Sequence, residues 1–166
     1  KKNTPVTNAP RYLFHTSFCG STLLANCLNT LPSCLAYKEP NSLFTLAKLK
    51  TASLAGGTSM TRKWHDLMKM ALFFLSKTFT PSETALIKHS PVDTFSLNEF
   101  VAISPQGQTR GIFLYSDLKT LLSSVFQAGN RRNWYRYCIS ILPSFTRVPD
   151  ILAKISVKNL SDAEIA

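Results

Sequence analysis

A hydroxyl-rich turn between an apolar run and an amphipathic segment is the part of this sequence best suited to chemistry. The turn reads Ser17-Phe18-Cys19-Gly20-Ser21-Thr22 and follows the apolar run Tyr12-Leu13-Phe14. Gly20 can take a backbone conformation that other residues rarely adopt, and Ser21 and Thr22 suit the cap and first turn of a helix. A strand, turn and helix in this order direct unpaired backbone N–H groups and the positive end of the helix dipole at one point. The pattern therefore predicts a site for an anion, most often a phosphate.

The turn differs from the phosphate loop of ATP- and GTP-binding proteins, which reads G-x-x-x-x-G-K-[ST] with a lysine that reaches the outer phosphates. Here Ser21 stands in the lysine position, and His15 stands where the first glycine belongs. An atypical nucleotide kinase or NTPase that binds ATP and Mg²⁺ through Thr22 remains an alternative. A nucleotide-binding module without catalytic activity and an ordinary strand–helix junction capped by serine are two further alternatives.

The octet from Ser17 to Leu24 resembles the 5′-phosphosulfate loop of the sulfotransferase superfamily, whose common form is P-K-S-G-T-T-W-L. It is most similar to a bacterial sulfotransferase-like group with F-C-G-S-T-L-L in this position. The resemblance implies a P-loop NTPase-like three-layer fold and 3′-phosphoadenosine-5′-phosphosulfate as co-substrate. The activity it implies is transfer of the sulfuryl group to an unidentified hydroxyl or amine acceptor. The co-substrate would be held by Ser17, Phe18, Cys19, Gly20, Ser21 and Thr22, and no metal is expected because positioning and electrostatics suffice.

Phe18 departs from this family pattern, because the usual loop carries a lysine or arginine there that donates to the bridging oxygen of the phosphosulfate. Either Lys88 or Lys38 would then supply the cation, or the protein would bind the co-substrate without turning it over. The second outcome is the inactive module, which Tyr115 also favours.

The general base that the resemblance implies is Glu39, which ends a predicted strand just before Pro40. A carboxylate partly shielded from water has a suitable pKa for that role, and the alternative is an ordinary surface glutamate. The pair Lys88-His89 resembles the cytosolic sulfotransferase segment I-K-T-H, which implies that Lys88 contacts the sulfuryl group and His89 acts as base. His89 comes one position early, however, and on a strand this points it to the opposite face from Lys88. A structural histidine is therefore the alternative for His89.

For the 3′-phosphate, the segment from Tyr115 to Ser123 is similar to the family pattern R-N-P-x-D-x-x-x-S. Ser123 matches the serine, whereas Tyr115 stands in place of the arginine. Lys119 or the pair Arg131-Arg132 could substitute for it. The alternative for that pair is capping of the helices on either side.

The elements that must position these residues alternate between strand and helix. Apolar runs predict strands over 11–17, 34–39, 84–89 and 111–115, and helical periodicity predicts helices over 21–29, 41–49, 60–77 and 131–142, with another that Asp117 caps. Residues 51–59, with two glycines, are expected to form a flexible loop. The inward faces of the two most periodic helices are expected to hold Met60, Trp64, Leu67, Met68, Ala71, Leu72 and Leu75 in one, and Leu118, Leu121, Leu122, Val125 and Phe126 in the other.

This alternation predicts an α/β fold with a mainly parallel sheet covered by helices on both faces. Ligands of such sheets bind beyond the carboxyl ends of the strands. The candidate residues Ser17, Glu39 and Lys88 all follow or end predicted strands. We therefore expect them to meet at one edge of the sheet.

Composition bounds the remaining possibilities. The 166 residues suit one domain spanning 1–166, with 1–10 expected as a disordered tail and the domain expected to be truncated at its C-terminus. A net charge of +10 favours anionic partners such as nucleotides and sulfated or phosphorylated substrates, and its scatter along the chain disfavours nucleic acid. The expected partners are a nucleotide co-substrate and a small-molecule or glycan acceptor. No apolar run is long enough to cross a bilayer. The four cysteines form no C-x-x-C pair, so a reduced, cytoplasmic location is expected.

Overall fold

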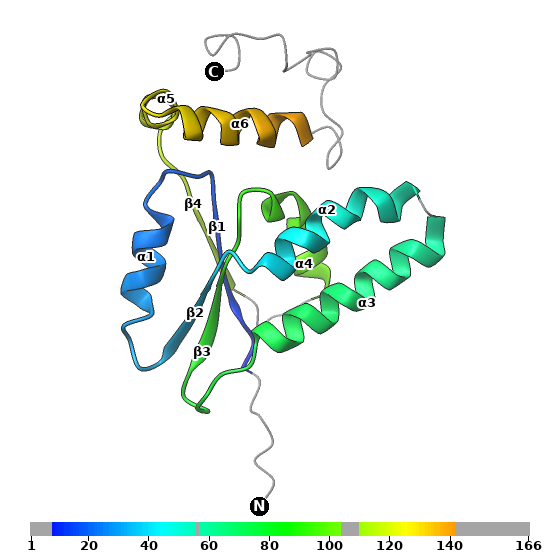
Figure 1. Ribbon diagram of the computed structural model, residues 1–166. Helices are drawn as coiled ribbons and strands as arrows, with labels where there is room; N and C mark the ends of the chain where they lie inside the picture. Colours follow the sequence, from blue (N-terminus) through cyan, green and yellow to red (C-terminus); the bar gives the residue numbers. More distant parts are fainter. Residues whose placement is uncertain (1–7, 56, 104–109, 142–166) are drawn as a thin grey trace, which may run out of the picture.

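The structure is a computed structural model that describes residues 8–55, 57–103 and 110–141 (Figure 1). Its elements follow in the order β1 (Arg11–His15), α1 (Ser21–Leu28), β2 (Cys34–Lys38), α2 (Asn41–Ala55), α3 (Gly57–Leu75), β3 (Thr84–Lys88), a 3₁₀ turn η1 (Asp93–Ser96), α4 (Leu97–Ile103), β4 (Arg110–Leu114), α5 (Leu118–Phe126) and α6 (Gly129–Ile141).

The four strands form one parallel sheet in the order β2-β3-β1-β4. In register, Lys88 of β3 pairs with Lys38 on one side and with Leu13 on the other, and His15 of β1 pairs with Leu114. Helix α1 lies on one side of the sheet, α2, α3 and α4 lie on the other, and α5 and α6 lie above the carboxyl ends of the strands (Figure 1). The expected α/β fold with helices on both faces of a parallel sheet is confirmed.

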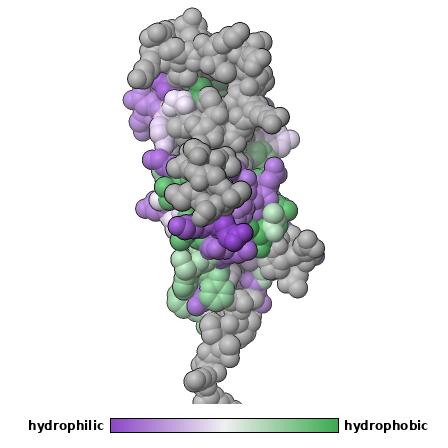
Figure 2. All heavy atoms as spheres, turned by 90° about the vertical axis from the view of Figure 1, so that its right-hand side faces the viewer, coloured by the Kyte–Doolittle hydropathy of each residue, from purple (hydrophilic) through white to green (hydrophobic). Residues whose placement is uncertain are grey.

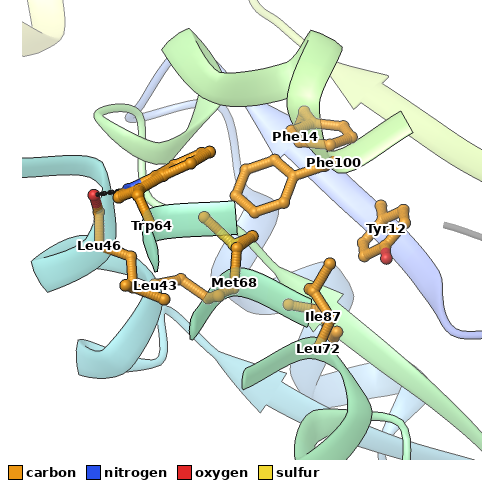
Figure 3. Packing of buried hydrophobic residues seen from close by; sticks show 9 residues of the cluster. All are labelled: Tyr12, Phe14, Leu43, Leu46, Trp64, Met68, Leu72, Ile87 and Phe100. Atoms are coloured by element: carbon orange, nitrogen blue, oxygen red, sulfur yellow. Dashed lines mark hydrogen bonds between the residues drawn. The ribbon is translucent and has the colours of Figure 1, made fainter. Parts of the chain in front are cut away.

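The larger core fills the space between the sheet and the helices α2, α3 and α4 (Figure 3). It consists of Tyr12, Phe14, Leu43, Leu46, Trp64, Met68, Leu72, Ile87 and Phe100. The indole N–H of Trp64 donates to the carbonyl of Leu46 at 2.7 Å, which satisfies the one polar atom of this side chain inside the core. This cluster fixes how α2 and α3 lie against the sheet.

The opposite face of the sheet carries a smaller cluster of Leu13, Ala25 and Leu86 beneath α1. Successive side chains of a strand point to opposite faces. Tyr12 and Phe14 therefore face the larger core, whereas Leu13 and His15 lie on the α1 side. The same alternation places Ile87 in the larger core and Lys88 on the α1 side. The strands thus deliver His15 and Lys88 to the same face.

Several expectations about the helices are wrong in detail. The loop expected over 51–59 is largely helical, since α2 continues to Ala55 and α3 begins at Gly57. The α2 extension reads TASLA, in which alanine and leucine favour a helix. Leu67 is 44% exposed although we expect it in the inward stripe. Helix α6 begins at Gly129, two residues before the expected start of this helix at residue 131, so the chain turns at residues 127–128.

The Asp117 cap of α5 is confirmed, because its Oδ1 accepts from the backbone N–H of Thr120 at 2.9 Å. The inward face expected for α5 is only partly correct. Val125 is buried, but Leu118 is 67% exposed and Phe126 37% exposed. Helix α5 lies at the carboxyl edge beside α6 rather than on a sheet face, so it has less apolar surface to cover it (Figure 1).

The surface on the α2–α3 side mixes hydrophobic and hydrophilic patches (Figure 2). Within the described residues, no helix combines the length and hydropathy that crossing a membrane requires. Of the expected tail 1–10, only residues 8–10 are described. There the Asn8 amide donates to the carbonyls of Pro81 and Glu83.

Candidate functional site

The N-terminus of α1 is open to a ligand. Gly20, rather than Ser21, is its N-cap, with a φ of 81°, and no side chain caps the helix. The first helical hydrogen bond runs from the N–H of Leu24 to the carbonyl of Gly20. The amides of Ser21, Thr22 and Leu23 therefore precede the helical hydrogen-bond ladder. A glycine cap leaves this first turn without a side-chain acceptor, which is the arrangement that suits a bound anion.

The backbone around this turn is strained. Ser17 and Phe18 have positive φ values of 72° and 48°, and Glu39, after β2, has a φ of 49°. Such conformations cost about 1–2 kcal/mol for residues with a Cβ, and they persist where surrounding contacts enforce them. Here the N–H of Ser17 donates to Nδ1 of His15 at 3.0 Å, and the N–H of Glu39 donates to the carbonyl of Lys88 at 2.8 Å. The three strained residues all lie at the carboxyl edge of the sheet.

A cavity of about 390 Å³ lies at this edge, which is within the size range of small-ligand sites. It is lined by His15, Ser17, Phe18, Gly20, Ser21, Thr22, Glu39, Lys88, Pro91, Asn130, Arg131 and Trp134. Lys88 and Arg131 bring positive charge to this lining, and Glu39 is its carboxylate.

Lys88 is the most buried cation of the site, with 1% of its surface exposed. Its ammonium forms an ion pair with the Glu39 carboxylate, and its Nζ lies 3.0 Å from Nε2 of His15. The Glu39 side chain remains 45% exposed. The charge of Lys88 is thus held at the cavity wall by one partly exposed carboxylate.

His15 links this ion pair to the loop. Because the N–H of Ser17 donates to Nδ1, the proton of a neutral His15 ring must lie on Nε2. Nε2 is 3.5 Å from Oε1 of Glu39, so His15 and Lys88 both direct donors at the same carboxylate oxygen. An anion entering the cavity would give these two donors a second acceptor.

Glu39 is strongly favoured in its ionised form. The hydrogen bond from His15, followed by the hydrogen bond and charge of Lys88, outweighs partial burial and lowers the pKa of Glu39 from 4.5 to about 2. At neutral pH the carboxylate is therefore ready to accept a proton. Its basicity is weak while both donors stay on it.

Helix α6 covers the loop through contacts with residues 16 and 18. The hydroxyl of Tyr135 donates to the carbonyl of Thr16 at 3.0 Å, and its ring stacks against Phe18 with centroids 6.0 Å apart. The guanidinium of Arg131 also lies over the Phe18 ring, 5.0 Å from its centroid. Burial raises the pKa of Tyr135 to about 12, so its hydroxyl keeps its proton.

His89 lies outside the cavity lining, on the opposite face from Lys88. Its ring is fully buried, stacked on Phe14 at 4.5 Å and packed against Phe100 at 4.4 Å. Burial lowers the pKa of His89 to about 3 and raises that of Asp93, 3.8 Å away, to about 6. Among the described residues, neither ring nitrogen of His89 has a hydrogen-bond partner.

The site residues expected from the sequence divide into those that line the cavity and those that do not. The cavity brings together Ser17, Phe18, Gly20, Ser21, Thr22, Glu39, Lys88 and Arg131. Outside it lie Cys19, whose thiol donates to the carbonyl of Leu114, and Ser123, which is exposed on α5. Lys38 bonds to Oδ1 of Asn26 instead of entering the cavity.

Sequence reasoning missed four lining residues. His15 ends β1 two positions after Leu13, so strand alternation places it on the α1 face and could have identified it. Pro91, Asn130 and Trp134 gave no such signal. The last two come from α6, whose docking on the loop depends on contacts between distant parts of the chain.

These features together define an α/β protein with a cationic, amide-lined cavity at the carboxyl edge of a parallel sheet. Within the described residues, no group of three histidine, cysteine or acidic side chains is placed to hold a metal ion. No protein-family model matches the chain, and the search of curated proteins found no relative.

Proposed function

We propose that this protein transfers a sulfuryl group from 3′-phosphoadenosine-5′-phosphosulfate to a hydroxyl or amine acceptor. The observation that carries the proposal is the convergence on one cavity of the open first turn of α1, the buried Lys88 and the carboxylate of Glu39. The chemistry needs an anion cradle, a cation at the transferring group and a base, and these three parts supply them.

In this proposal the amides of the first turn of α1, with Ser21 and Thr22, hold the 5′-phosphosulfate. Lys88 donates to the sulfuryl oxygens. The acceptor oxygen or nitrogen attacks sulfur, and the bond between sulfur and the bridging oxygen breaks, leaving its electron pair on the 5′-phosphate. Glu39 takes the proton that the acceptor loses. The products are the sulfated acceptor and adenosine 3′,5′-bisphosphate, and Glu39 later releases its proton to water.

The position of His89 gives it no contact with the reacting atoms, so we assign the base role to Glu39 alone. The 3′-phosphate recognition expected from Ser123 also lacks support at the cavity, because Ser123 is exposed on α5 outside the lining.

Thermal stabilisation by adenosine 3′,5′-bisphosphate without metal is the first test, with ATP and Mg²⁺ measured in parallel. Ligand at one hundred times its dissociation constant adds about 2.7 kcal/mol, or roughly 5–10 °C in Tm for a chain of this size. A shift with the bisphosphate alone supports the proposal. A shift that requires ATP and Mg²⁺ favours a kinase or NTPase, and no shift with either ligand contradicts nucleotide binding.

Turnover then separates an enzyme from an inactive binding module. We expect Glu39→Gln to bind the bisphosphate but to lose sulfate transfer, and Lys88→Met to lose both tight binding and transfer. Glu83→Gln is the matched control, because Glu83 precedes the amino end of β3, whereas Lys88 ends that strand, and Glu83 does not line the cavity. Its carboxylate accepts the backbone N–H groups of Phe79 and Thr80. Transfer that is unchanged in Glu39→Gln would exclude Glu39 as the base.

A further inference from the structure

We infer that Phe18 is a positioning residue that holds Arg131 at the cavity, so that α6 supplies the cation for the anion bound by the loop. This inference deepens the proposed function and rests on it only for the identity of the anion. It assigns Arg131 to the group held at the first turn of α1.

The first observation is the pairing of the two side chains. Phe18 lies in the middle of the loop and carries no polar side-chain atom, yet both it and Arg131 line the cavity. The Arg131 guanidinium lies 5.0 Å from the centre of the Phe18 ring, within the range of a cation–π contact. Phe18 therefore brings a cation to the loop although it is not one itself.

The second observation is that a further side chain of α6 contacts the ring. Tyr135 stacks on Phe18, and its hydroxyl bonds to the carbonyl of Thr16 at 3.0 Å. Phe18 also has a φ of 48°, a conformation that bulky residues rarely adopt without contacts that enforce it. The Phe18 ring is thus the part of the loop on which α6 packs, through both Tyr135 and Arg131.

The third observation concerns the donors of Arg131. Its Nη1 donates to the carbonyl of Ser124 at 3.0 Å and approaches Oε1 of Gln127 at 3.4 Å. Both of these hydrogen bonds use the same nitrogen. Within the part of the chain that the structure describes, Nε and Nη2 have no assigned acceptor, and a guanidinium suits bidentate binding of a phosphate or sulfate group.

Arg132 provides a matched control. It carries the same charge one position along α6, and its Nη1 donates to the carbonyl of Phe126 at 2.7 Å, much as Arg131 bonds to Ser124. Arg132 does not line the cavity. Its replacement therefore removes an equal charge and a similar link between α5 and α6.

The test measures binding of inorganic pyrophosphate, a nucleotide-free anion, by titration calorimetry. We expect Arg131→Ala to weaken binding about 10- to 100-fold, as for a lost charged hydrogen bond, and Arg132→Ala to change it less than about twofold. Phe18→Leu should weaken binding about three- to tenfold, and Phe18→Tyr, which keeps the ring, should bind like the wild type. The double variant Phe18→Lys, Arg131→Ala should recover most of the affinity, because the loop itself then carries the cation.

A second readout does not depend on a ligand. The Nε–H resonance of Arg131 should carry the ring-current shift of Phe18 in the wild type and in Phe18→Tyr, and should lose it in Phe18→Leu. Circular dichroism identifies any variant that fails to fold. If Phe18→Leu does not fold, the pyrophosphate affinities of Phe18→Tyr and of the double variant test the inference instead.

Equal affinities in Arg131→Ala and Arg132→Ala would overturn the inference, as would a double variant no tighter than Arg131→Ala. An unchanged Phe18→Leu would also overturn it, because Arg131 would then act without the ring. The failure of the proposed function looks different: the wild type would bind pyrophosphate with this pattern of variants but would not bind adenosine 3′,5′-bisphosphate. If the wild type binds no inorganic anion, the inference is overturned whatever the nucleotide does.

Discussion

Replacing Glu39 by glutamine isolates the contribution of the ion pair at the cavity. Glutamine keeps an oxygen that can accept from His15 and Lys88, but it removes the negative charge that faces the buried ammonium. The difference between the ordinary pKa of 4.5 and the value of about 2 in the fold corresponds to roughly 3 kcal/mol. Because the Glu39 side chain is 45% exposed, solvent screening reduces this figure. We expect Glu39→Gln to lose about 1–2 kcal/mol of unfolding free energy at pH 7.

The pH dependence gives the sign of the effect. Folding lowers the pKa of Glu39, so its contribution is fully present above pH 4.5 and is lost as the pH falls through about 2. The stabilities of the wild type and of Glu39→Gln should therefore differ at pH 7 and converge between pH 4.5 and pH 2. The other titrating groups are common to the two proteins. Asp93 is the one to watch, because the charge of Glu39 adds, as the smallest of its causes, to the rise of the Asp93 pKa to about 6.

Urea unfolding at pH 7, 5, 4 and 3 measures this difference, with Glu83→Gln as the control that keeps its backbone hydrogen bonds. A Glu39→Gln variant as stable as the wild type at pH 7 would show that the ion pair contributes nothing. A difference that stays constant down to pH 3 would show that it does not arise from the charge of Glu39.

Three further predictions concern buried and strained residues. Asp93→Asn should raise the unfolding free energy at pH 7 by up to about 2–3 kcal/mol, because burial raises the pKa of Asp93 to about 6. Urea unfolding should show that this gain in stability vanishes as the pH falls from 6 towards 3.8, where the carboxyl of the wild type is protonated in the fold. His89→Phe should keep pyrophosphate binding and sulfate transfer. Because burial lowers the pKa of His89 to about 3, the variant should also lose less unfolding free energy than the wild type as the pH falls from 6.5 to 3. A loss of sulfate transfer with normal pyrophosphate binding would show that His89 takes part in catalysis. Gly20→Ala should lower the unfolding free energy in urea by about 1 kcal/mol because the φ of Gly20 is 81°, although an added Cβ meets no atom within 4 Å. Gly129→Ala at the start of α6 should be neutral or stabilising. Equal effects at the two glycines would show that the positive φ of Gly20 is not the cause.

The sequence was sufficient to predict how strand residues divide between the two faces. Alternation separates Tyr12 from Leu13, as the two core clusters confirm. It also separates Lys88, which lines the cavity, from His89, which stacks on Phe14 in the larger core. The parallel arrangement then brings Glu39 and Lys88 to one edge. These predictions depend only on period and order along the chain, which short segments already carry.

What the sequence did not reveal depends on contacts between distant segments. The roof of the cavity comes from α6, which reaches the loop through a hydrogen bond between Tyr135 and Thr16, 119 positions apart. No local pattern marks that contact, and so Trp134 and Asn130 were missed. The helical extension of α2 through Ala55 is another case, since the neighbouring glycines suggested a loop. There, the helix propensity of the alanine and leucine residues favours the helix.

Under the proposed function, the ion pair between Lys88 and Glu39 couples binding of the phosphosulfate to the basicity of Glu39. Without a ligand, His15 and Lys88 both direct donors at one oxygen of Glu39 and hold its pKa at about 2, where it is a weak base. A phosphosulfate in the cavity offers these donors anionic oxygens, and each donor that turns to the ligand raises the basicity of Glu39. The carboxylate of Glu39 therefore becomes an effective base only once the phosphosulfate is bound. Because Lys88 is buried, it cannot turn to bulk water instead, so the exchange of partners requires an anion at the first turn of α1.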